Sequence, residues 1–65
     1  MKPECKLIGE NGNVFNLIGI VRTTLKNNGL YIELAQFDAD FKELQDGGGR
    51  YNDVLILFMQ YVDVA

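Results

Sequence analysis

Clusters of glycine and asparagine divide this 65-residue chain into four short pieces, and this punctuation limits the fold more than any other feature. The clusters lie at residues 9–13, 27–29 and 47–49. Glycine and asparagine favour turns and helix ends, so each piece between the clusters can hold only one short element. We therefore expect a single small domain over residues 1–65, built from about four short elements.

Apolar residues in the two middle pieces repeat at helical spacing. Between residues 13 and 28 they follow the i, i+3, i+4, i+7 template, with Asn13 as a candidate N-cap and 27–29 as the stop. Between residues 30 and 46 the apolar positions alternate in steps of four and three. Both pieces predict helices. The β-branched residues of 13–21 and the alternation in 30–34 keep a strand open as the alternative.

The two outer pieces are expected to meet. Residues 4–10 are typical of a short strand, and 61–64 alternate like a second one that could pair with it. Residues 50–65 otherwise have a helical apolar face that starts near Asn52 or Asp53, although the run 54–59 also fits a buried strand. The expected fold class is α+β, mainly helical, with a short N-terminal strand, three helices and an optional short C-terminal strand.

The helical apolar positions predict the hydrophobic core. We expect it to contain Val14, Leu17, Ile18, Val21, Leu34, Phe37, Phe41, Leu44, Val54, Leu55 and Phe58. Six further apolar residues lie off these positions and are the candidate interface: Ile20, Tyr31, Ile32, Ile56, Leu57 and Met59. Such a surplus is rarely left in water, so we expect self-association, most simply as a homodimer.

The chain lacks the residues that common catalytic sites need. It contains no histidine, no serine and a single cysteine, which excludes serine–histidine triads, histidine acid–base catalysis and histidine metal ligation. We expect no catalytic residue, no cofactor and no metal site. Without a histidine to activate it, Cys5 is expected to be buried and unreactive.

Other polar groups have simple structural interpretations. The acidic residues between 38 and 46 are expected on the solvated face of a helix, and 47–49 as a helix C-cap and turn. Among the tyrosines, Tyr51 and Tyr61 are expected in the core, whereas Tyr31 fits a core rim and an interface equally well.

The charge pattern does not suggest a nucleic acid or a membrane as a partner. The net charge is −3 and the six cationic residues are scattered, whereas a nucleic-acid binder needs a basic patch. The longest unbroken apolar run, 54–59, is too short to span a membrane, and the start of the chain has no apolar signal segment. We expect a cytoplasmic protein.

Two segments resemble a group of very small bacterial proteins that occur in Gram-positive genomes, prophages and mobile elements. Residues 6–19 follow the pattern K-L-x-G-E-x-G-N-x-F-x-[IL]-[IL]-G, and residues 59–64 follow M-x-Y-V-[DE]-V. The middle of the chain departs from the group, with aromatic residues in place of a more charged helix. The resemblance carries no known activity. By analogy it implies an accessory or host-interaction role.

Two classes of function remain. The first is a non-enzymatic protein–protein interaction module, such as a phage or mobile-element modulator of a host protein. The second is a small-ligand-binding protein or a minimal enzyme that uses carboxylates and Arg50 in an oligomeric cleft. A cleft of about 300 Å³ or more, lined by Arg50 and carboxylates, would favour the second class.

Overall fold

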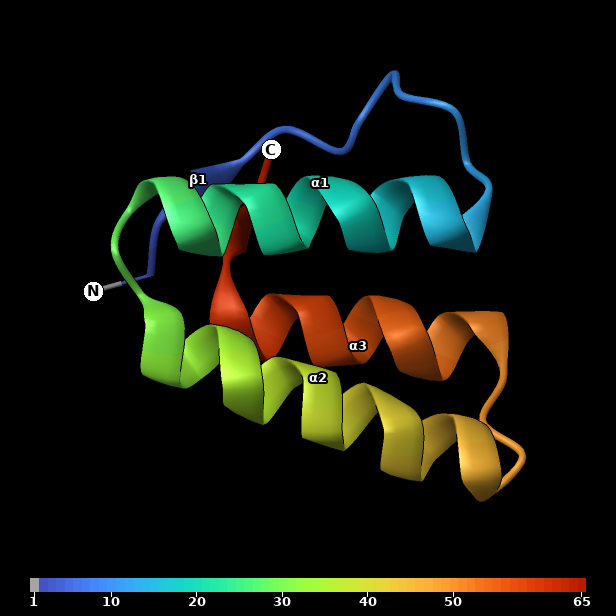
Figure 1. Ribbon diagram of the computed structural model, residues 1–65. Helices are drawn as coiled ribbons and strands as arrows, with labels where there is room; N and C mark the ends of the chain where they lie inside the picture. Colours follow the sequence, from blue (N-terminus) through green and yellow to red (C-terminus); the bar gives the residue numbers. More distant parts are fainter. Residues whose placement is uncertain (1) are drawn as a thin grey trace.

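The computed structural model describes residues 2–65, which form three helices and one pair of short strands (Figure 1). The elements in chain order are β1 (Glu4–Cys5), α1 (Val14–Asn27), α2 (Tyr31–Asp46), α3 (Tyr51–Tyr61) and β2 (Asp63–Val64). The predicted class, mainly helical α+β, is confirmed. The three segments that could have been strands, 13–21, 30–34 and 54–59, lie within or at the start of helices.

Successive helices run in opposite directions, and each packs against the other two (Figure 1). β1 and β2 pair in parallel, with Glu4 opposite Asp63 and Cys5 opposite Val64, as expected for strands from the two outer pieces. The N-terminal strand is shorter than predicted. The amides of Leu7 and Ile8 both donate to the carbonyl of Ala65, which ends the regular ladder.

Side chains near the helix ends explain where the helices start and stop. The Asn13 side chain accepts a hydrogen bond from the Phe15 amide at 2.9 Å, as an N-cap should. α1 ends at 27–29, where Gly29 has a φ of 70°. The predicted start of α3 at Asn52 or Asp53 is wrong, because the N-cap is Arg50. Asp53 stabilises this end from the first turn, where it accepts from the Arg50 amide at 3.0 Å.

The core is formed mainly by the predicted helical positions. Leu17, Ile18, Val21, Phe37, Val54 and Phe58 are buried, and the other predicted core residues are half-buried and pack against them: Val14, Leu34, Phe41, Leu44 and Leu55. Phe37 lies at the centre, with its ring centroid 6.0 Å from that of Phe58 and 5.4 Å from that of Tyr61. Cys5 is buried as expected, and four further buried residues were not among the predicted core positions: Leu7, Leu25, Leu57 and Val62.

Two expectations about α3 need correction. Leu57, expected outside the core, is buried at 7% exposure. α3 packs against both α1 and α2, so it buries a wider arc than the single face that was predicted. Tyr51, expected in the core, is 48% exposed because it begins the helix at the edge of the molecule. Tyr61 is half-buried against the core, in agreement with its prediction.

Candidate interaction surface

The six predicted interface residues do not form one surface. Ile20 is half-buried against the core and Leu57 is part of it. Tyr31 and Ile32 are exposed in the first turn of α2, whereas Ile56 and Met59 are exposed on α3. The four exposed candidates thus lie on two different helices.

A groove beside α3 gathers a different set of apolar side chains. It lies between the segment 7–12 and the helix and has a volume of about 380 Å³. Tyr51, Leu55 and Met59 line it from α3, where their spacing of four residues places them in one row. The remaining lining residues are Leu7, Ile8, Glu10, Gly12, Leu17, Phe58 and Val64. We refer to this feature as the α3 groove.

Hydrogen bonds hold the opposite wall of the α3 groove in place. The Tyr51 hydroxyl donates to the Gly12 carbonyl at 2.8 Å, which ties α3 to the loop before α1. The Asn16 side-chain amide donates to the Asn11 carbonyl at 2.9 Å, and the Ile8 amide donates to the Ala65 carbonyl at 2.9 Å. The groove is thus preformed rather than dependent on a loose loop.

Large apolar side chains around the α3 groove remain in contact with solvent. Ile8 is 71% exposed, Met59 51% and Val64 40%. Sequence reasoning missed Ile8 and Val64 because both were assigned to strands, whose pairing is too short to cover them. The sequence did contain a signal for them. Two short apolar strands in a chain this small have no further strands to pair with, so some of their apolar side chains must stay exposed.

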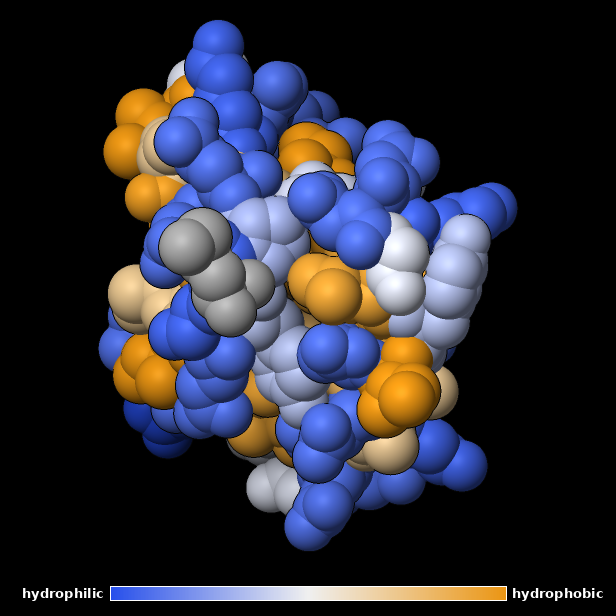
Figure 2. All heavy atoms as spheres, turned by 90° about the vertical axis from the view of Figure 1, so that its left-hand side faces the viewer, coloured by the Kyte–Doolittle hydropathy of each residue, from blue (hydrophilic) through white to orange (hydrophobic). Residues whose placement is uncertain are grey.

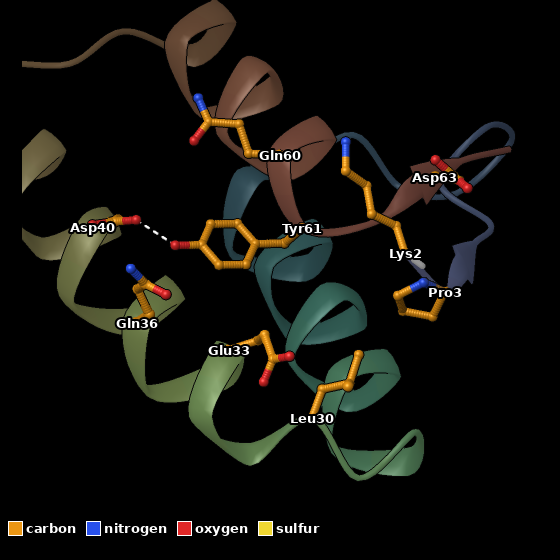
Figure 3. A pocket seen from close by; sticks show the side chains of 9 residues that line it. All are labelled: Lys2, Pro3, Leu30, Glu33, Gln36, Asp40, Gln60, Tyr61 and Asp63. Carbon is orange, nitrogen blue, oxygen red and sulfur yellow. Dashed lines mark hydrogen bonds between the residues drawn. The ribbon is translucent and has the colours of Figure 1, made fainter.

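A second hollow is polar and lies where α2, the end of α3 and the N-terminal segment meet (Figure 3). Its volume is about 770 Å³. In Figure 3 the Tyr61 ring reaches across the hollow towards α2, and its hydroxyl donates a hydrogen bond to Asp40. Lys2 donates to the Met59 carbonyl at 2.8 Å on the other side. The remaining lining residues are Pro3, Leu30, Glu33, Gln36, Gln60 and Asp63.

The Tyr61 phenol in the polar hollow is held in its protonated form. Burial raises the pKa of Tyr61 to about 12, and the hydrogen bond to Asp40 and the negative charge of that carboxylate add to the effect. At neutral pH the phenol therefore keeps its proton and cannot act as a general base. Within residues 2–65, no group of three or more cysteine, aspartate or glutamate side chains is arranged to hold a metal ion.

Figure 2 shows the end of the molecule where α1 passes into α2. Hydrophilic side chains cover most of this face, and apolar side chains appear as separate groups rather than as one patch. This end therefore does not present a continuous apolar surface to a partner.

Arg50 is not among the residues that line the polar hollow. It lines a small hollow of about 220 Å³ together with apolar residues that include Phe15, Phe41 and Tyr51. The residues that line this hollow include no aspartate or glutamate. Arg50 and the carboxylates around Tyr61 thus line different hollows.

Cys5 is 1% exposed, as expected for a residue of the core. The Thr24 hydroxyl lies 3.4 Å from its sulfur and also donates to the Ile20 carbonyl at 2.9 Å. The thiol is therefore shielded by α1.

Comparison with known proteins gives no relative: no family model, no curated protein and no solved structure matches this chain. In the part of the chain that the structure describes, no helix is long and apolar enough to cross a membrane.

Proposed function

We propose that this chain is a non-enzymatic protein-binding module that uses the α3 groove, and that one of its partners is a second copy of itself. The observation that supports this proposal is the lining of the groove, which contains the exposed side chains of Ile8, Met59 and Val64 together with the half-buried Leu55. Removing apolar surface from water is the main favourable contribution in most protein–protein association. Contiguous apolar patches on small proteins commonly mark binding sites.

Charge supports a second copy as the partner. The protein carries a net charge of −3, so two copies repel each other overall. Only one acidic residue, Glu10, lines the α3 groove. A twofold axis through the groove would therefore bury apolar side chains against one another with few carboxylates facing each other.

A second partner from the host cell follows from the resemblance to prophage and mobile-element proteins. Under this proposal the protein works in the cytoplasm and modulates a host protein through the same groove. A chain this short buries little surface by itself, so binding would also stabilise its fold.

The alternative, a small-ligand-binding protein, would use the polar hollow around Tyr61. Its volume of about 770 Å³ is large enough for a ligand. However, the hollow lacks Arg50, and the Tyr61 hydroxyl is already engaged by Asp40. These contacts favour the binding module.

Two matched variants test the proposal. Met59→Lys and Ile32→Lys each replace an exposed apolar side chain by a lysine, but only Met59 lines the α3 groove. In sedimentation equilibrium at micromolar concentration, we expect the wild type and Ile32→Lys near twice the chain mass of 7.3 kDa. Met59→Lys should sediment as a single chain while circular dichroism shows an intact fold.

Either of two results would contradict self-association through the α3 groove. One is a wild-type protein that sediments as a single chain at this concentration. The other is a dimer that Met59→Lys leaves intact. A host partner is expected to bind the wild type and Ile32→Lys in a lysate and to be lost with Met59→Lys.

A further inference from the structure

The chain contains two asparagine–glycine pairs, Asn11–Gly12 and Asn28–Gly29, and the fold places them in different surroundings. Such pairs are sites of spontaneous deamidation, because glycine has no side chain to hinder the attack of its backbone nitrogen on the preceding side chain. We propose that Asn11 is a deamidation site in the folded protein and that Asn28 is protected.

The nucleophile is free at the first pair and engaged at the second. Within residues 2–65, the Gly12 amide donates no hydrogen bond. The Gly29 amide donates to the Lys26 carbonyl at 3.0 Å, where it closes the end of α1. Attack by Gly29 would therefore first break a bond of the helix C-terminus.

The hydrogen bonds of the two asparagine side chains also favour reaction at Asn11 over Asn28. The Asn11 side-chain oxygen accepts a hydrogen bond from the Asn13 amide at 2.9 Å. This donor polarises the side-chain carbonyl and would stabilise the negative charge that develops on its oxygen during attack. The Asn28 side chain instead donates its amide group to the Thr24 carbonyl at 2.7 Å, which holds the leaving nitrogen in place.

The reaction needs only water and base. The Gly12 nitrogen loses its proton to hydroxide, which becomes water, and forms a bond to Cγ of Asn11. Nδ2 takes a proton from water as its bond to Cγ breaks, so that ammonia leaves and hydroxide is regenerated. Water then opens the cyclic imide at one of its two carbonyls. The products are aspartate, or isoaspartate with one additional methylene group in the main chain.

The modification would alter the α3 groove. Gly12 lines the groove and its carbonyl accepts from Tyr51, while the Asn11 carbonyl accepts from Asn16. In isoaspartate the former Asn11 carbonyl becomes part of a carboxylate, and the extra methylene in the main chain displaces Gly12. Either product adds one negative charge beside Glu10. Asn11 deamidates whether or not the groove binds a partner, whereas a loss of binding rests on the proposed function.

Peptide mapping by mass spectrometry tests the proposal on the full chain, incubated in mildly alkaline buffer. We expect Asn11 to convert roughly tenfold faster than Asn28 in the folded protein, since the loss of one ordinary hydrogen bond corresponds to about this factor. In urea the two rates should become similar. Equal deamidation rates of Asn11 and Asn28 in the folded protein would overturn the proposal that the fold protects Asn28. A faster rate at Asn11 that persists in urea would overturn it as well.

Gly12→Ala provides the matched control. A Cβ at this position would lie 3.6 Å from the Tyr51 hydroxyl, an ordinary contact, so the variant is expected to keep the fold. It should slow conversion at Asn11 and leave Asn28 unchanged. Unchanged conversion at Asn11 in this variant would show that the Gly12 nitrogen is not the nucleophile.

Discussion

Phe37 and Phe41 lie one turn apart on α2, yet only Phe37 is completely buried. Phe41 is half-buried and lines the small hollow beside Arg50. We expect Phe37→Ala to lower the free energy of unfolding by about 3–5 kcal/mol and Phe41→Ala by clearly less, because a cavity forms only at the enclosed position. Urea unfolding of both variants measures the difference. Equal losses would contradict the central position of Phe37.

Tyr61 gives a residue-scale prediction that depends on pH. Its pKa is raised to about 12 in the fold, first by burial and then by Asp40. Its ordinary value is about 10, so the unfolded chain releases this proton at lower pH than the folded one. The stability from the protonated phenol is therefore complete below pH 10 and is lost as the pH rises towards 12. The tyrosinate absorbance step near pH 12 should be absent in Tyr61→Phe. A wild-type titration without this step would contradict the buried contact with Asp40.

At the scale of elements, replacing a glycine by alanine is expected to have opposite effects on stability at two positions, Gly19 and Gly49. Gly19 lies inside α1 and a Cβ there would meet nothing within 4 Å. Gly19→Ala should therefore stabilise the protein by about 0.5–1 kcal/mol through helix propensity. A Cβ on Gly49 would lie 2.8 Å from the carbonyl oxygen of Leu44, so Gly49→Ala should destabilise it. Thermal unfolding of the two variants compares them. A melting temperature of Gly19→Ala below that of the wild type would contradict the free space around a Cβ at position 19 of α1.

The elements themselves could be predicted because local signals agreed with the packing. Asn13 caps α1 and the glycines at 29 and 48 follow helix ends with positive φ, as the punctuation indicated. The burial of α3 could not be predicted in the same way. A single apolar face was assumed, but contacts with α1, α2 and β2 bury Leu57 as well as Phe58. That arrangement depends on packing between elements, which periodicity within one element does not encode.

At the scale of the whole molecule, the candidate site was only partly predictable. Met59 was expected at an interface and lines the α3 groove, but Ile8 and Val64 join it through contacts between the two outer pieces of the chain. Such contacts link residues that are far apart in sequence. The pairing of the pieces was expected from their apolar alternation, whereas its short length, which leaves Ile8 exposed, was not.

The proposed dimer predicts that stability depends on protein concentration. If folding and association are coupled, a tenfold increase in concentration should raise the melting temperature of the wild type by roughly 3–6 °C, because mass action favours the dimer. Ile32→Lys should show the same dependence, since Ile32 lies outside the α3 groove. Met59→Lys should melt at one temperature at all concentrations, below that of the concentrated wild type. A melting temperature that is independent of concentration for the wild type would mean that this small core is stable without a second copy.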